Sequence, residues 1–175
     1  PTVLEITSFA SMDLMQLCGV VKNRFDDCTV MERPQEILVD VIGLGAGVVD
    51  RLREQNLPVR GVNVAEAPST KKNYLNLRAE LWFAIKDWLA QRDCRLPNDD
   101  ELVAELAAPL YKYTSTGKIK IESKDEMRKR GIKSPDKADA LALTMASSAA
   151  SFSGSESYFG YNFKKPLKSR IIRVG

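Results

Sequence analysis

The stretch Glu36–Asp50, EILVDVIGLGAGVVD, decides the fold. It opens with Ile37, Leu38 and Val39, an apolar run that predicts a strand buried on both faces by covering helices. Asp40 interrupts this run, and a carboxylate in a buried strand needs a hydrogen-bond partner, a counter-charge or a cation. We therefore expect Asp40 at the sheet edge where α/β proteins place their sites, with a carboxylate that only shapes the turn as the alternative.

Three glycines follow this acid, at positions 43, 45 and 47. Their spacing differs from the G-x-G-x-x-G fingerprint of dinucleotide-binding proteins, and no G-K-[ST] follows as in a phosphate-binding loop. The glycines instead predict a tight turn with close backbone packing. A helix is expected from Gly47 to about Gln55.

Composition restricts the possible functions. The 175 residues suit one domain with a full-sized core, and 44% hydrophobic with 28% charged residues is typical of a soluble globular protein. The net charge of +3 does not by itself single out a nucleic-acid binder. Three cysteines without C-x-x-C spacing indicate reduced thiols and an intracellular protein. The absence of histidine excludes His-based catalytic triads and His metal clusters.

The first part of the chain alternates strands and helices. A strand is predicted at Thr2–Phe9, and a helix with Ser11 as its N-cap follows. After the central strand and the helix that starts at Gly47, Pro58–Val64 predicts another strand. This order is typical of a parallel α/β layer.

The next part is expected to be mainly helical, with one hairpin. The predicted elements are a polar loop at Ala65–Lys72, a long helix at Asn73–Arg92, a short helix at Asp99–Ala107, and a hairpin of Leu110–Thr114 with Lys118–Glu122.

A second informative stretch is Ser123–Met145, SKDEMRKRGIKSPDKADALALTM. It predicts a short charged helix, Lys124–Arg130, and then a helix with Ser134 as N-cap. Asp136 and Asp139 are three residues apart on this second helix, so they share a face.

These two acids lie on a helix that is otherwise mostly apolar. Like charges on such a helix repel each other and lose solvation, and a divalent cation would relieve both effects. In the alternative, the Asp136 carboxylate only interacts favourably with the N-terminal end of the helix dipole, and Asp139 pairs with a nearby Lys or Arg.

The composition changes after Ser147. We expect a domain at residues 1–150, and a Ser-rich linker with a basic and aromatic tail at 151–175. The tail is interpreted either as a segment that orders on nucleic acid or another subunit, or as one pinned on its own domain.

Three stretches together resemble a known family. They are VDVIGLGAGVVDRL at 39–52, NLRAELW at 76–82 and GKIKIESKDEMRKRGIKSPDKADALALT at 117–144. In this order they closely resemble the C-terminal nuclease domain of the large terminase subunits of tailed bacteriophages and prophages. The resemblance implies an α/β, RNase H-like fold, a mixed sheet with helices on both faces. It also implies a metal-dependent endonuclease that cuts concatemeric double-stranded DNA during packaging, with two Mg²⁺ or Mn²⁺ ions.

The same resemblance implies the site residues. Asp40, Asp136 and Asp139 match the family's catalytic and metal-binding acids. The family's first catalytic Asp lies on an earlier strand, whereas this chain begins at what resembles the third strand. We therefore expect the sheet to lack its first one or two strands and the chain as given to be inactive. Neither Glu5 nor Asp13 is expected to replace the first acid.

Contacts to DNA and to partner proteins are also expected. The residues predicted to meet the DNA backbone are Lys118, Lys120, Lys124, Arg128 and Lys133. The resemblance implies an ATPase domain in the same parent polypeptide, with the portal and the small terminase subunit as further partners, in the bacterial host cytoplasm and without a membrane.

Two other functions compete with this one. The first alternative is a catalytically defective terminase fragment that binds DNA or the portal. A resolvase-like nuclease shares the fold and the layout of acids, although NLRAELW and SKDEMRKRG favour terminase. A nucleotide-binding protein is disfavoured by the glycine spacing.

Overall fold

The computed structural model describes residues 2–9 and 11–146, and the backbone of 168–174. Its elements are, in chain order, β1 (Thr2–Phe9), α1 (Leu14–Asp26), β2 (Ile37–Asp40), α2 (Gly45–Glu54), β3 (Val59–Val62), α3 (Leu77–Ala90), α4 (Asp100–Ala107), β4 (Tyr111–Tyr113), β5 (Ile119–Ile121), α5 (Lys124–Lys129), α6 (Asp136–Thr144) and β6 (Lys168–Val174). Among the described residues, none of the helices has the length and apolar character needed to span a membrane.

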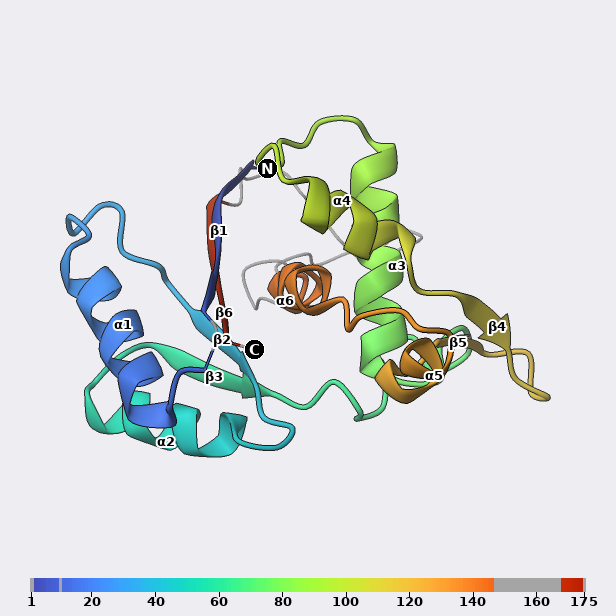
Figure 1. Ribbon diagram of the computed structural model, residues 1–175, viewed down its shortest axis with the longest axis horizontal. Helices are drawn as coiled ribbons and strands as arrows, with labels where there is room; N and C mark the ends of the chain where they lie inside the picture. The colour runs from blue at the N-terminus through green and yellow to red at the C-terminus, as the bar shows by residue number, and fades with distance from the viewer. Residues whose placement is uncertain (1, 10, 147–167, 175) are drawn as a thin grey trace.

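The strands form three pairs within the described residues. β2 and β3 pair in parallel, as the sequence predicts, and β4 and β5 form the predicted antiparallel hairpin. β1 pairs in parallel with β6, so the backbone of 168–174 lies along the domain's own first strand. The boundary expected at residue 150 falls outside the described residues. Figure 1 shows the β1–β6 and β2–β3 pairs between α1 and α2 on one side and α3 and α6 on the other, with the β4–β5 hairpin beyond α3. The α/β arrangement with helices on both faces is confirmed.

Two hydrophobic clusters hold these layers together. The smaller cluster joins α1, α2 and the β2–β3 pair, with Cys18, Val48, Leu52 and Leu57 buried at its centre. The larger cluster packs α3 against α4, α6 and β5, and its most buried members include Leu81, Leu102 and Leu141. α6 also contacts β2, so this helix packs beside the central strand.

The turn after β2 depends on its glycines. Gly43 has a φ of +75°, which other residues adopt only with strain. A Cβ atom on Gly45 would collide with the backbone oxygen of Asp40, so only glycine fits there. This close approach lets α2 begin at Gly45, two residues earlier than predicted.

Three predicted helix starts are wrong, two of them because another side chain makes the capping hydrogen bond. Asp13, and not Ser11, caps α1, since its side chain accepts the amide of Gln16 in a capping box. α3 begins at Leu77 and not at residue 73, because the Asn76 side chain caps it. At α6 the cap position is Pro135, and the Ser134 hydroxyl instead donates to the Asp136 carboxylate.

The hairpin is tied to α5 by carboxylates. Glu126 lies 2.8 Å from Lys112 Nζ and 3.5 Å from Lys120 Nζ. Hydrogen bonds from Lys112 and from Ser123 hold the pKa of Glu126 far below its usual range. Glu122 forms a 2.6 Å ion pair with Arg130, and this guanidinium likewise lowers the pKa of Glu122. These ion pairs attach β4 and β5 to the helix that follows them.

We predict that Leu52→Ala lowers the free energy of unfolding by about 2–5 kcal/mol, because it leaves a cavity in the smaller cluster. The Leu52 side chain is 0% exposed, whereas Leu44 just before α2 is 81% exposed. Leu44→Ala is therefore the matched control and should change stability by no more than about 0.5 kcal/mol. Urea unfolding measures both, and equal effects would contradict this core assignment.

We also predict that acid loosens the hairpin. A carboxylate whose pKa is lowered by folding stabilises the folded state above its unfolded pKa and loses that effect as pH falls. Amide hydrogen exchange in β4 and β5, corrected for intrinsic rates, should therefore accelerate below about pH 4.5, the ordinary Glu value. Glu126→Gln should exchange faster already at pH 7, whereas Asp125→Asn on the same helix should not. Exchange that is independent of pH and of Glu126 would refute this role.

Candidate functional site

Asp40 is the last residue of β2 and lies at the predicted edge of the sheet. Its Oδ1 accepts the backbone amide of Ile42 at 3.0 Å, and the side chain is exposed. The prediction that this strand is buried on both faces is wrong, since its first three residues are only half-buried and Asp40, which ends it, is exposed. The observed hydrogen bond is the one that a turn-shaping carboxylate makes.

Asp136 and Asp139 lie one helical turn apart at the start of α6 and meet the same cation. Lys124 Nζ, at the start of α5, is 2.9 Å from Asp136 Oδ1 and 3.6 Å from Asp139 Oδ2. The prediction that the two acids share a face is therefore confirmed. Their carboxylates converge on one positive charge.

Asp139 has further donors from α3. Trp82 Nε1 donates to Asp139 Oδ1 at 2.8 Å, and Arg78 lies 3.0 Å from the same oxygen. Arg78 also donates to the backbone oxygen of Glu122 at 2.7 Å. Both charged partners are largely shielded, with 15% of the Arg78 and 21% of the Asp139 side chain exposed. Asp139 therefore pairs with basic residues, as the alternative interpretation of the sequence predicted.

Arg78 and Trp82 were not predicted as site residues, although they belong to the NLRAELW stretch. A signal existed in their spacing, because residues four apart on a helix share a face. The Arg78 guanidinium also lies 5.7 Å from the centre of the Trp82 ring. Nothing in the sequence alone, however, connects Arg78 and Trp82 to Asp139, which is 61 and 57 residues away.

The three predicted metal ligands are not brought together as one cluster. Within the part of the chain that the structure describes, no three carboxylate, thiol or imidazole side chains gather closely enough to hold a metal ion. α6 contacts β2, the strand that ends at Asp40, but the Asp40 carboxylate accepts only the Ile42 amide among the hydrogen bonds of the described residues. Glu5 forms a 2.9 Å ion pair with Arg24, and Asp13 caps α1. Both roles agree with the expectation that neither residue replaces the first catalytic acid.

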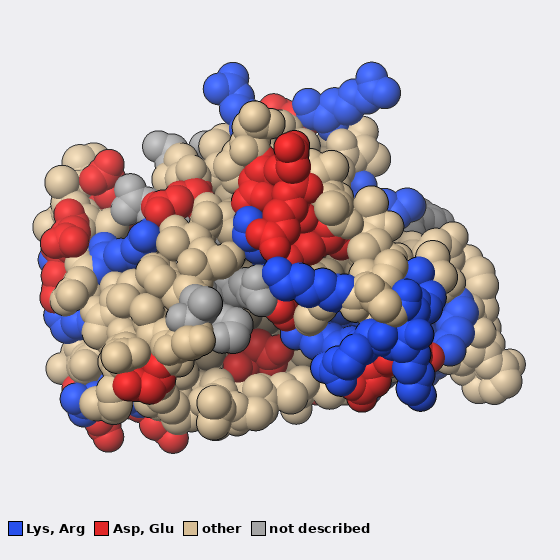
Figure 2. Space-filling view, in the orientation of Figure 1, with Lys and Arg blue, Asp and Glu red and all other residues tan. Residues whose placement is uncertain are grey.

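The predicted DNA-binding residues lie around α5 and the hairpin, and four of the five have acidic partners. These pairs are Lys120 with Glu126, Lys124 with Asp136, Arg128 with Asp125 and Lys133 with Glu101. Figure 2 shows Lys and Arg side chains gathered over the region of α5, with acidic side chains between them. The surface is thus basic but already partly neutralised.

Comparison with known proteins identifies the fold. No family model and no curated protein sequence matches the chain. Among solved structures, a lysine-to-alanine variant of the nuclease domain of the large terminase subunit gp2 of bacterial virus Sf6, with manganese, matches with a TM-score of 0.65 at 21% identity, over 78% of this chain and 75% of that one. The unmodified Sf6 domain gives a TM-score of 0.64 at 22% identity, over 78% of this chain and 74% of that one.

A more distant structure agrees with these. The large terminase nuclease from thermophilic phage G20c, with bound magnesium, matches with a TM-score of 0.54 at 17% identity, over 75% of this chain and 60% of that one. Identities this low establish the fold and leave the activity to be argued from the site. The chain therefore has the RNase H-like fold of the nuclease domains of phage large terminase subunits, as the resemblance of its sequence implied.

Proposed function

We propose that this chain is the metal-dependent endonuclease domain of a DNA-packaging terminase, acting on concatemeric double-stranded DNA. One observation carries the proposal: Asp136 and Asp139 converge on the Lys124 ammonium, in a chain with the fold of metal-bound terminase nucleases. Carboxylates arranged around one positive charge form the kind of site that a nuclease metal needs.

The residues present fit Mg²⁺ or Mn²⁺. Both ions prefer oxygen donors, and Asp136 and Asp139 provide carboxylate oxygens that already surround a cation. We assign these two acids and Asp40 as the residues that hold the metal, and we propose that two ions are used. When bound, such ions supply an activated water and stabilise the leaving oxygen of the phosphodiester.

The neighbouring side chains prepare the acids for this role. Trp82 and Arg78 both bond Asp139 Oδ1, which orients the carboxylate so that Oδ2 is nearest Lys124. The Ser134 hydroxyl donates to Asp136 Oδ1, the same oxygen that accepts from Lys124. Lys124 is half-exposed, so its ammonium has room to leave the acids and meet a DNA phosphate.

The basic surface is proposed to bind the DNA backbone without sequence preference. The proposed contacts are Lys118, Lys120, Lys124, Arg128 and Lys133. Their acidic partners would have to be exchanged for phosphates, so binding should weaken steeply with salt. We further propose the partners that the resemblance implies: an ATPase domain of the same polypeptide, the portal and the small terminase subunit, in the host cytoplasm.

A DNA-binding or portal-binding module without cleavage is the second candidate. It is favoured by the neutralisation of Asp139 by Arg78 and Lys124, and by the absence of a three-acid cluster among the described residues. Cleavage separates the two candidates, because only the nuclease needs the acids.

We predict that Asp40→Asn, Asp136→Asn and Asp139→Asn each reduce Mn²⁺-dependent plasmid nicking by about a hundredfold or more, since each removes a ligand charge. DNA binding should remain and stay sensitive to salt. Asp125→Asn, a change of the same kind on exposed α5, is the control and should cut normally.

The assay uses this chain and a longer form that contains it. Cleavage that persists in Asp139→Asn would refute the assignment, whereas salt-sensitive binding without EDTA-sensitive cleavage in either form would favour the binding module.

We also predict that Lys124→Met tightens Mn²⁺ binding by about tenfold, which corresponds to about 1.4 kcal/mol. The ammonium competes with the metal for both acids, so its removal favours the metal. Calorimetry measures the affinity, with Lys129→Met on the same helix as control. An equal gain in both variants would show a general effect of charge and would refute the competition.

A further inference from the structure

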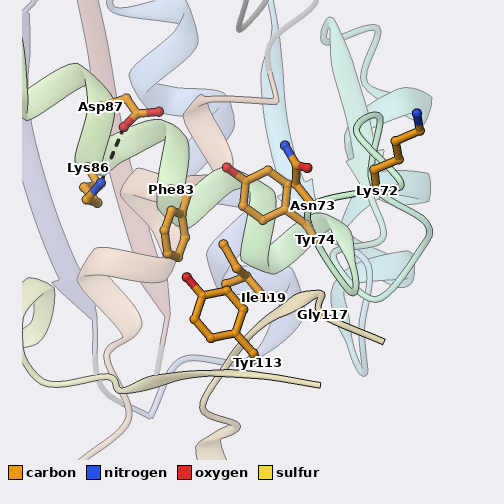
Figure 3. Close-up of a pocket in the computed structure, with 9 residues that line it drawn as sticks. All are labelled: Lys72, Asn73, Tyr74, Phe83, Lys86, Asp87, Tyr113, Gly117 and Ile119. Carbon is orange, nitrogen blue, oxygen red and sulfur yellow. Dashed lines mark ion pairs between the residues drawn. The ribbon is translucent and has the colours of Figure 1, made fainter. Parts of the chain in front are cut away.

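A pocket of about 310 Å³ lies between α3, the loop before it and the β4–β5 hairpin. Three aromatic rings line it, those of Tyr74, Phe83 and Tyr113. The aliphatic Ile119 and the basic Lys72 and Lys86 complete this part of the wall. Figure 3 shows the three rings arranged around one space, with Lys86 on one side and Lys72 on the other. Its volume is that of small-molecule sites in proteins.

The rings are partly packed and partly open. Tyr74 and Phe83 lie 5.6 Å apart between ring centres, and Phe83 also packs edge-on against Tyr111 at 5.4 Å. Tyr113 is 65% exposed although it lines the pocket. An exposed aromatic ring beside packed ones offers a free face for a flat ligand.

The walls are held in place from two directions. The backbone amide of Leu75 donates to Ile119 at 2.9 Å, and the amide of Ile119 donates to Asn73 at 2.8 Å. Earlier in the same loop, the Glu80 carboxylate, which is buried in α3, accepts the backbone amides of Ser69 and Thr70. The pocket is therefore built before any ligand arrives.

Charge identifies the class of ligand. The charged residues of the lining are Lys72, Lys86 and Asp87, and Asp87 lies 3.8 Å from Lys86. The lining therefore carries one more positive than negative charge. The cores of protein–protein interfaces are depleted in lysine, whereas aromatic rings interleaved with basic side chains are typical of nucleic-acid surfaces.

We propose that this pocket receives an unstacked nucleobase of the DNA, which stacks on Tyr113 while Lys72 and Lys86 meet the flanking phosphates. The proposal rests on the proposed function, since it places the base on the same DNA that the acids would cut. It adds a subsite for distorted DNA that the acids and the basic surface do not provide.

The position of the pocket fits this role. Ile119 in its wall and Lys124 at the acids are five residues apart in the chain, so they are separated by at most about 18 Å. This distance corresponds to about five base pairs of duplex DNA. A strand that crosses the acids can therefore place a nearby base in the pocket.

Binding to a labelled duplex tests the proposal without any chemistry. The probe is a duplex with one bulged 2-aminopurine, compared with its fully paired counterpart, in EDTA. We expect this chain to prefer the bulged duplex by about five- to tenfold, with a change in 2-aminopurine fluorescence on binding, because only the bulged base is free to stack on the protein's aromatic ring. Tyr113→Leu and Lys72→Gln should remove that preference.

Matched controls come from the neighbouring residues. Leu110→Ala changes an apolar residue just before β4 that is 57% exposed and lies outside the pocket lining, and Lys71→Gln changes the lysine next to Lys72. Tyr111 is not used as a control, because its ring packs edge-on against both Phe83 and Tyr113. Both should keep the preference for the bulge. Equal losses in Leu110→Ala and Tyr113→Leu, equal binding of the two duplexes, or no DNA binding at all would each overturn the proposal. If the unmodified chain nicks DNA with Mn²⁺ but does not prefer the bulged duplex, the pocket alone is refuted. Nicking that does not depend on the acids would refute the proposed function.

Discussion

The Arg78 guanidinium joins three parts of the site that are distant in sequence. From α3 it reaches Asp139 on α6 and the backbone oxygen of Glu122, at the end of the hairpin. Because Arg is charged at all ordinary pH values and presents its donors in a planar fork, it bonds both acceptors at once. This contact positions α6, and with it the acid pair, relative to the segment that carries Lys124.

Charge balance explains why the acid pair is stable in this arrangement. Asp136 and Asp139 carry two negative charges at close range, and Lys124 and Arg78 return two positive ones. A divalent ion placed on the acids would leave an excess of positive charge, which DNA phosphates or withdrawal of the Lys124 ammonium would offset. Metal, lysine and DNA would then be coupled through the same two carboxylates.

The hairpin gives the basic surface and the aromatic pocket a common support. Its ion pairs to α5 fix it from one side, and the backbone bonds between Ile119 and the loop before α3 fix it from the other. Glu80, buried in α3, anchors that loop in turn. Ile119, which begins β5, lines the pocket, and the backbone oxygen of Glu122, which follows β5, accepts a hydrogen bond from Arg78, which also pairs with Asp139. The hairpin therefore contacts the pocket directly and the acids through Arg78.

The sequence by itself determined what depends on neighbours along the chain. The strands at Thr2–Phe9 and Ile37–Asp40, the hairpin and the end of α5 at Gly131 follow from local patterns, and the shared face of Asp136 and Asp139 follows from helical spacing. Only the tertiary structure decided which groups meet across the chain. It chose Lys124 and Arg78 as partners of the acids, exposed Asp40, and assembled the pocket from segments that the sequence separates. The physical reason is that backbone periodicity acts over a few residues, whereas ion pairing and burial depend on how whole elements pack.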